Sequence, residues 1–138
     1  SLLISVLDFR FGWSSRFADW LTTLGCAGWI LGSYFTFWNM LTNTHFESTV
    51  RIQNDREHKA IDTGPYGIIR HPGYLGGLIT YAVTPLILGS LWCIIPSALS
   101  FIGFVIRTAK EDKTLQAELP GYAEYARRIR YRLIPGIW

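Results

Sequence analysis

Charged residues are scarce in this sequence, and two long stretches have none. Lys, Arg, Asp and Glu make up 17% of the 138 residues, whereas soluble domains usually carry about one quarter. No charged residue occurs from Trp20 to Phe46, and none from His71 to Ile106. Uncharged stretches of this length argue against a soluble domain built from amphipathic elements, and they favour helices that cross a membrane.

Cysteine is also scarce, because only Cys26 and Cys93 are present. Both lie inside the uncharged stretches, without a CxxC pair or a nearby set of Cys and His residues. This pattern excludes a disulfide framework and a zinc cluster of the usual spacing. No metal site is predicted, and the two thiols are expected to act as small apolar side chains.

Several common catalytic motifs are absent. There is no GxGxxG after a strand pattern, no GxSxG nucleophile elbow and no HExxH metal motif. The polar residues that remain are mostly tyrosines, arginines and a few carboxylates. Tyrosine faces attract a sulfonium or ammonium group by about 0.5–2 kcal/mol. Such a site suits a cationic cofactor and a methyl transfer, which depends more on positioning than on acid–base groups.

The uncharged stretches predict about three membrane spans. The first is long enough for one bilayer-spanning helix at about residues 18–42. The second has Gly89-Ser90 near its centre and is interpreted as two spans at about 73–89 and 91–108. Each holds about 17 residues, or roughly 25 Å of helix, which suffices with tilt or local thinning. The apolar start SLLISVLD resembles the end of a truncated N-terminal span. A buried soluble hairpin is the alternative.

Basic residues are distributed unevenly over this arrangement. A hairpin of the second and third spans places the connector 43–72 and the tail 109–138 on one side. Of the 13 Lys and Arg residues, only Arg10 and Arg16 fall on the other side. The positive-inside rule therefore places the connector and the tail in the cytosol. The net charge of +3 is thus a feature of topology and does not indicate nucleic-acid binding.

We therefore expect an all-α integral membrane helical bundle that forms one domain over residues 1–138. Apolar side chains recur at helical spacing along the tail: Leu115, Leu119, Tyr122, Tyr125 and Ile129. Pro120-Gly121 interrupts this pattern, which predicts two amphipathic tail helices. The connector is expected to be structured, with a short extended piece at STVRIQ.

Polar side chains gather at the predicted cytosolic ends of the spans. The stretch TGPYGIIRHPGYLGG holds Arg70 and His71 between two proline-centred turns, and Arg107 lies one turn before Glu111 and Asp112. Because the two spans form a hairpin, we expect His71 and Glu111 to be neighbours around one pocket. Taken singly, the two arginines fit interfacial anchors, and Glu111 fits an ordinary i,i+4 partner of Arg107.

Three blocks resemble membrane methyltransferases of the isoprenylcysteine carboxyl methyltransferase group: GPYGIIRHPGYLGG, RTAKEDKTL and GYAEYARRIRYRLIPGIW. The related phospholipid methyltransferases share the RHPxYxG and acidic-pair elements. The resemblance covers roughly residues 43–138. It implies methyl transfer from S-adenosylmethionine, in a cavity on the cytosolic side, to a lipophilic or amphiphilic acceptor. That acceptor would be an isoprenylcysteine-like carboxylate, a phospholipid or a small thiol.

The resemblance also implies site residues. The positions that match the family's cofactor-binding residues are Gln53, His58, Lys59, Ala60, Ile61, Tyr66, His71, Pro72, Gly73, Tyr74 and Glu111. Arg107 matches an arginine proposed to orient the substrate carboxylate, and Arg70 is expected to close the site or to hold the cofactor's carboxylate; these two are the candidate catalytic residues. The family's second arginine has no counterpart, because nothing basic lies between Arg16 and Arg51. The acceptor therefore stays open.

Two other functions remain as alternatives. Membrane sterol reductases end in a similar PYRLxPG tail and bind NADPH, although a reductase should need further basic contacts and more spans. A non-catalytic membrane protein of the same fold is the other alternative. The expected partners are membrane lipids and a lipophilic or lipid-modified substrate, and the sequence indicates no oligomeric state.

Overall fold

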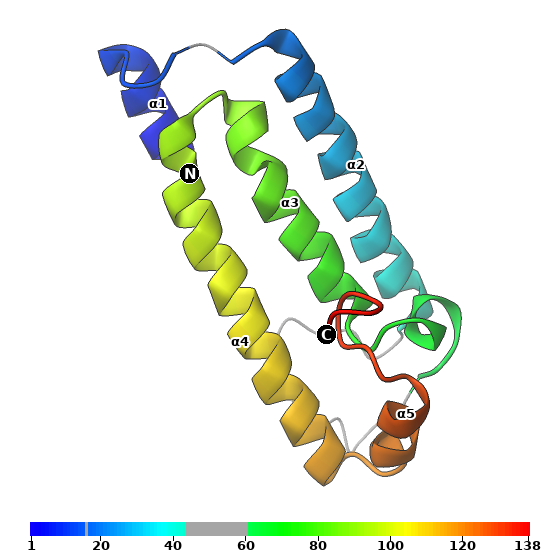
Figure 1. Cartoon of the computed structure of the whole chain (residues 1–138). Coiled ribbons are helices and arrows are strands. Elements are labelled where there is room, and N and C mark those ends of the chain that lie inside the picture. Colours follow the sequence, from blue (N-terminus) through cyan, green and yellow to red (C-terminus); the bar gives the residue numbers. More distant parts are fainter. Residues whose placement is uncertain (16, 44–60) are drawn as a thin grey trace. The chain divides into compact units, whose positions relative to one another are not determined.

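The computed structural model describes residues 1–15, 17–43 and 61–138, and these ranges contain helices and no strand (Figure 1). The elements are α1 (Leu2–Phe11), α2 (Asp19–Thr42), η2 (Gly64–Gly67), α3 (Pro72–Leu88), η3 (Leu91–Cys93), α4 (Ile94–Glu118) and α5 (Tyr122–Arg128). The all-α prediction is confirmed for these residues. The extended piece expected at STVRIQ lies outside them.

The chain divides into two compact units. Unit 1 comprises Ser1–Tyr34 and Gly76–Phe104, and unit 2 comprises Phe35–Leu75 and Val105–Trp138. Helices α2, α3 and α4 each contribute residues to both units.

Unit 1 contains the turn that joins α3 to α4. Gly89 has φ +60°, a left-handed conformation that glycine adopts at little cost, and it ends α3. The chain then passes through Ser90 and η3 into α4. The rings of Tyr81 on α3 and Phe104 on α4 lie 5.4 Å apart. The chain therefore folds back on itself at the Gly89-Ser90 step, as the sequence predicts.

Glycines allow α2 to pack closely on α3 within unit 1. A Cβ atom on Gly28 would lie 2.6 Å from Val83 Cγ1, and one on Gly32 would lie 2.7 Å from the carbonyl oxygen of Gly76. Small residues at helix contacts let two backbones approach, which is a common device where helices pack in lipid. A side chain at Gly32 would force the two helices apart.

One helical segment of the described residues, Leu91–Glu118, is long and apolar enough to cross a membrane, and Pro72–Leu88 is apolar but shorter. Only 17% of the most apolar window in the longer segment is buried, so its large side chains face outward. Helix α2 matches the bounds predicted for the first span. Its mean hydropathy is too low for it to count among the membrane-crossing helices, because Thr, Ser, Asn and Tyr interrupt its apolar residues. The predicted number of three spans thus stays a prediction.

Helix α4 continues well past residue 108, where the third span was expected to end. Residues 107–118 are rich in good helix formers such as Ala, Lys, Glu and Leu, so the helix extends beyond the apolar segment. It ends just before Pro120, and Gly121 has φ +79°. The first of the two predicted tail helices is therefore the C-terminal part of α4, and the second is α5.

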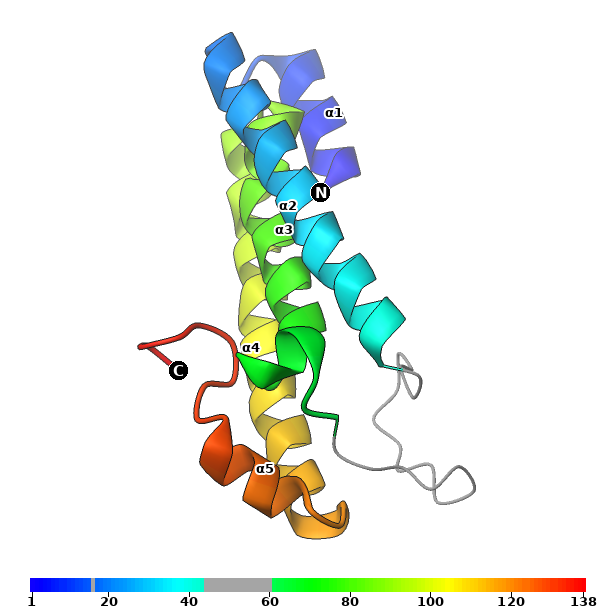
Figure 2. The same cartoon turned by 90° about the vertical axis from the view of Figure 1, so that its right-hand side faces the viewer.

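The apolar stripe of the tail forms the core of unit 2. Leu119, Tyr122 and Tyr125 are buried together, and Leu115, Ile129 and Tyr66 pack against them. The stripe predicted from helical spacing thus packs against Tyr66 of η2. After α5 the chain runs back beside the start of α3 (Figure 2), where the amides of Arg70 and His71 bond the carbonyls of Tyr131 and Arg132.

Candidate active site

The start of α3 and the C-terminal part of α4 bring two sequence motifs together in unit 2. Arg70 Nε lies 2.8 Å from Asp112 Oδ1, and Arg70 Nη2 lies 3.0 Å from Asp112 Oδ2. His71 Nε2 lies 3.3 Å from the same Oδ1. The RHPGY stretch and the acidic pair of α4 are therefore neighbours, as expected from the helical hairpin.

Asp112 is the centre of a buried hydrogen-bond network. Its side chain has no exposed surface, and besides Arg70 and His71 it accepts bonds from Tyr122 Oη at 3.2 Å, Gln116 Nε2 at 2.7 Å and Arg132 Nε at 2.9 Å. A buried carboxylate is costly unless its oxygens are satisfied and its charge is paired. Here two guanidinium groups supply the pairing, and both oxygens are bonded.

Arg70 also donates hydrogen bonds to the tail. Nη1 donates to the main-chain carbonyls of Ala126 at 3.1 Å, Ile129 at 2.9 Å and Arg130 at 3.2 Å. These carbonyls lie at the C-terminal end of α5, where a cation is favourable. The catalytic role expected for Arg70 stays a prediction. These bonds favour a structural role, because the guanidinium group is already engaged within the protein.

A second cluster lies beside the first and is formed by Tyr74 of α3 with Arg107 and Glu111 of α4. Tyr74 Oη donates to Glu111 Oε2 at 2.5 Å, and the guanidinium of Arg107 lies 5.6 Å from the centre of the Tyr74 ring. The His71 ring is stacked on Tyr74 at 5.8 Å. Tyr74 and Glu111 are half-buried, whereas Arg107 is exposed. This cluster thus combines an exposed cation with a half-buried carboxylate, the half-buried ring of Tyr74 and the buried ring of His71.

The hydroxyl of Tyr66 is held by the side-chain amides of Asn39 in α2 and of Asn43, which follows the end of α2. It donates to Asn39 Oδ1 at 2.6 Å and accepts from Asn43 Nδ2 at 2.8 Å. Asn39 is 2% exposed, and its amide also lies against Gly73, where an added Cβ would lie 2.6 Å from Nδ2. Asn39 thus joins α2, η2 and the first turn of α3. The ring of Tyr66 packs against the buried cluster of Leu119, Tyr122 and Tyr125.

Burial changes the acidity of the tyrosines in unit 2. Desolvation raises the pKa of Tyr66 to about 12, although the hydrogen bond from Asn43 opposes this rise. Burial also raises the pKa of Tyr122 and Tyr125 far above the usual value, and the neighbouring charge of Asp112 adds to the rise for both. These hydroxyls therefore stay protonated near neutral pH and act as hydrogen-bond donors.

The remaining residues expected at the site divide into two groups. Pro72 is buried at the first position of α3, Gly73 follows it, and Ile61 is half-buried before η2. Four of the expected cofactor residues lie outside the described part of the chain: Gln53, His58, Lys59 and Ala60. The structure thus brings together His71, Tyr74, Glu111 and Arg107, and it places Tyr66 and Gly73 beside Asn39.

Sequence reasoning missed the importance of Asp112 and Asn39. Asp112 was noted only as the neighbour of Glu111, because a sequence does not say which of two adjacent acids faces inward. Asn39 lies in an apolar stretch and carried one signal, since an amide in such a stretch marks a candidate functional position.

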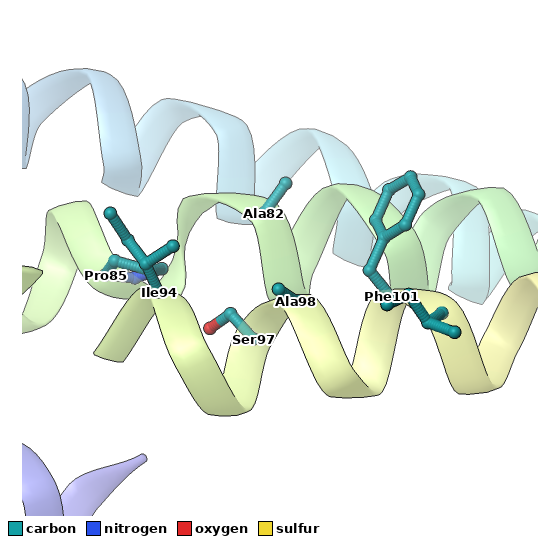
Figure 3. A pocket seen from close by; sticks show the side chains of 7 residues that line it. Ala82, Pro85, Ile94, Ser97, Ala98 and Phe101 are labelled. Atoms are coloured by element: carbon teal, nitrogen blue, oxygen red, sulfur yellow. The ribbon is translucent and has the colours of Figure 1, made fainter. Parts of the chain in front are cut away.

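Unit 1 has an apolar groove of about 270 Å³ between α3 and α4 (Figure 3). It is lined by Ala82, Pro85, Ile94, Ser97, Ala98, Phe101 and Ile102. Its single polar side chain, Ser97, is 5% exposed, and its hydroxyl has no hydrogen-bond partner in the described residues. The groove carries no group that could act in chemistry, so the polar clusters of unit 2 are the candidate site.

Three comparisons with known proteins each give a methyltransferase of the isoprenylcysteine type. A sequence model of the isoprenylcysteine carboxyl methyltransferase family matches residues 23–117. Protein-S-isoprenylcysteine O-methyltransferase B of Arabidopsis thaliana is 30% identical over 140 residues, covering 94% of this chain and 69% of that protein. The solved structure of the eukaryotic intramembrane Ras methyltransferase ICMT, determined without a monobody, is similar with a TM-score of 0.74 and 28% identity.

That structural match covers 86% of this chain and 43% of the solved chain, so this chain spans less than half the length of its solved relative. The resemblance inferred from the three sequence blocks is confirmed, and the matched region extends further toward the N-terminus than those blocks do. Each of these matches is to a methyltransferase, and none of them supports the reductase alternative.

Proposed function

This chain belongs to the isoprenylcysteine carboxyl methyltransferase family, and from this premise we propose that it transfers a methyl group from S-adenosylmethionine to a carboxylate on a lipophilic acceptor of the isoprenylcysteine type. We propose further that the reaction takes place at the cytosolic face of a membrane, in the protein of which this chain forms all or part.

The observation that carries the proposal is the cluster of Tyr74, Glu111 and Arg107 beside His71. Tyr74 and Glu111 form a 2.5 Å hydrogen bond, and Arg107 lies over the Tyr74 ring. These are the residues that the family resemblance assigns to cofactor and substrate. They come from α3 and α4, and the buried Arg70–Asp112 pair fixes the neighbouring residues of both helices.

The residues of this cluster fit the polar end of S-adenosylmethionine. Its α-ammonium group requires an acceptor, which the half-buried Glu111 carboxylate provides, and its cationic sulfonium favours aromatic walls such as Tyr74 and Tyr66. Gln53, His58, Lys59, Ala60 and Ile61 would complete the cofactor site. The bound cofactor supplies a methyl group activated by the positive sulfur.

The protein's own contribution is mainly positioning. A carboxylate acceptor is already deprotonated at neutral pH, so attack on a methyl group requires no general base. Arg107 is exposed and holds its charge beside Tyr74, which suits it to orient the acceptor carboxylate by a charge-assisted hydrogen bond. Holding two reactants in line removes several kcal/mol from the barrier without acid–base catalysis.

An apolar acceptor fits the surface of the chain. Large side chains of α4 such as Leu99 and Ile102 are 66% and 55% exposed, which in water would be unfavourable and in lipid would not. A lipid-modified acceptor would share this environment. The positive-inside pattern of the sequence supports the cytosolic placement of the site.

The experiment has two stages, both with the chain in detergent micelles or lipid nanodiscs. S-adenosylhomocysteine and NADPH are first titrated separately while the thermal unfolding midpoint is measured. We expect the midpoint to rise with S-adenosylhomocysteine and not with NADPH. A rise with NADPH alone would favour the reductase alternative, and no rise with either would leave a non-catalytic protein.

The second stage uses a radiolabelled methyl donor and three acceptors: a small S-prenylated cysteine, a phospholipid and a small thiol. We expect label in the prenylated cysteine, released by base as methyl esters are. The carboxyl-amidated form of the same compound is the matched control and should take no label. Transfer to the phospholipid or thiol alone would keep the methyltransferase and overturn the proposed acceptor.

A further inference from the structure

The contact between Asp112 and His71 has a consequence for the candidate site. Asp112 Oδ1 lies 3.3 Å from His71 Nε2, and it also accepts from Arg70 Nε at 2.8 Å. We propose that Asp112 is a positioning residue, which holds the proton of the neutral His71 ring on Nε2 and leaves Nδ1 as a hydrogen-bond acceptor for the bound cofactor. This inference rests on the proposed function, since it names a further residue of the same site.

The direction of the hydrogen bond follows from the partners of Asp112. Arg70 and Arg132 both donate to this carboxylate, and two guanidinium groups favour its ionised form, which can only accept. A histidine nitrogen beside an ionised carboxylate must therefore carry the proton. Because a neutral imidazole has one N–H and one acceptor nitrogen, Nδ1 is then the acceptor.

Within residues 1–15, 17–43 and 61–138, the second nitrogen of His71 is not used by another protein group. No hydrogen bond to Nδ1 occurs within the described residues. In the same residues, the buried side-chain polar atoms without a partner are the hydroxyls of Ser90 and Ser97, so Nδ1 is not an unpaired atom sealed in the interior. The stacking of His71 on Tyr74 places the ring in the cluster with Glu111.

The ligand group that this arrangement selects is a hydrogen-bond donor. Glu111 presents carboxylate oxygens and His71 presents an acceptor nitrogen, while Arg107 is the exposed cation of the cluster. Two acceptors that both neighbour Tyr74 suit an ammonium group, which has three N–H donors. Among the groups of S-adenosylmethionine, the α-ammonium meets this requirement, and the carboxylate does not.

The test measures the tautomer of His71 directly. The protein is labelled with ¹⁵N-histidine, and long-range ¹H–¹⁵N spectra are recorded at a pH at which histidine rings are neutral. The chain has three histidines, so the spectrum of His71→Gln assigns the ring. We expect the Nε2–H tautomer in the wild-type protein. A neutral ring with its proton on Nδ1 would overturn the proposal without any change to Asp112.

Two variants then distinguish an effect of Asp112 on the His71 ring from a general effect on the hydrogen-bond network. Asp112→Asn replaces a pure acceptor by an amide that can donate to Nε2, so we expect it to shift the ring toward the Nδ1–H tautomer. Gln116→Ala is the matched control, since it removes a 2.7 Å bond to the other oxygen of Asp112 and does not touch His71. The control should keep the wild-type tautomer. Identical ring spectra for Asp112→Asn and wild type would contradict the proposal.

Affinity for S-adenosylhomocysteine, measured by calorimetry, provides the second readout. We expect Asp112→Asn to weaken binding roughly tenfold, as loss of one charge-dependent hydrogen bond does, and Gln116→Ala to change it less than twofold. In the double variant with His71→Gln, Asp112→Asn should cause no further loss, because it acts through His71. Additive losses would overturn the positioning role. Absence of binding by the wild type would instead count against the proposed function, and the tautomer would still be decided by the spectra.

Discussion

Arg70 and Asp112, 42 residues apart in the sequence, form a two-point ion pair with N–O distances of 2.8 and 3.0 Å. Their side chains are 6% and 0% exposed. The pair joins the residue two positions before Pro72 to the C-terminal part of α4, and Arg70 also bonds the end of α5. The arginine between the two proline turns therefore organises unit 2, which explains why it occupies that place in the sequence.

Replacing Arg70 by Gln should destabilise the protein by about 3–5 kcal/mol, because a buried carboxylate then loses a charged partner. The measurement is chemical or thermal unfolding in detergent. Arg128→Gln is the matched control, since Arg128 pairs with Asp62 at 2.8 Å but both side chains are exposed. That pair should contribute about 0–1 kcal/mol. Equal losses for the two variants would contradict the structural part assigned to Arg70.

Glu111 and Arg107 should differ in what they affect. Glu111→Gln removes the negative charge expected to pair with the cofactor's ammonium group, so binding of S-adenosylhomocysteine should weaken about tenfold or more. Arg107→Ala should leave that affinity near wild type and lower kcat/KM for the acceptor. Lys110→Ala, an exposed lysine on the same helix, should alter neither. Unchanged cofactor affinity in Glu111→Gln would contradict the assignment of that residue.

Stability should fall at alkaline pH because of the buried tyrosines. The pKa of Tyr66 rises to about 12 in the folded protein, and those of Tyr122 and Tyr125 also rise. The folded state then keeps protons that the unfolded state loses above pH about 10. The stabilisation is therefore complete below pH about 10 and is lost as the pH rises toward the folded values. Each tyrosine should contribute a slope of roughly 1.4 kcal/mol per pH unit.

The measurement is the free energy of unfolding as a function of pH, with tyrosinate absorbance recorded in parallel. Tyr66→Phe should reduce the alkaline slope by about one proton, in addition to a loss at neutral pH from its broken hydrogen bonds. A stability that stays level up to pH about 12 would show that these hydroxyls ionise equally in both states.

The close packing of α2 on α3 predicts a sharp difference between two glycines. Gly32→Ala would bring a methyl group 2.7 Å from the carbonyl oxygen of Gly76, and a backbone atom cannot move aside cheaply. We expect a loss of about 1–3 kcal/mol. In Gly103→Ala no atom lies within 4 Å of the new methyl group, and alanine's helix propensity should stabilise by up to about 1 kcal/mol. A similar outcome for both would argue against the α2–α3 contact.

Much of the site's arrangement followed from sequence reasoning. The stretch without charge from His71 to Ile106, divided by Gly89-Ser90, predicted that the residues before α3 and those after the apolar part of α4 would meet. The contacts of His71 with Asp112 and of Tyr74 with Glu111 confirm this meeting. The reason is geometric: in a hairpin of two helices, residues at similar distances from the turn must be neighbours.

The sequence did not predict that Asp112 would be buried while Glu111 would be half-buried. Adjacent residues on a helix point about 100° apart, so one of them faces the interior and the other does not, and only the packing of α5 and the tail decides which. The continuity of α4 across residue 108 was also not evident, because the end of an apolar stretch marks a change of surroundings and not the end of a helix. Asn39 required knowledge of Tyr66 and Gly73, which approach it from other elements.

The bonds between Arg70 and the tail have a wider consequence. Arg70 reaches carbonyl groups of Ala126, Ile129 and Arg130, and its own amide bonds the carbonyl of Tyr131. Every residue type offers a carbonyl group, so these bonds place no demand on the side chains. At the two exposed positions, Arg130 and Tyr131, evolution is therefore free to exchange the side chain provided that the backbone keeps its path. Related proteins should therefore diverge there even when they retain an arginine at position 70, and weak tail similarity would be poor evidence that two such chains differ in architecture.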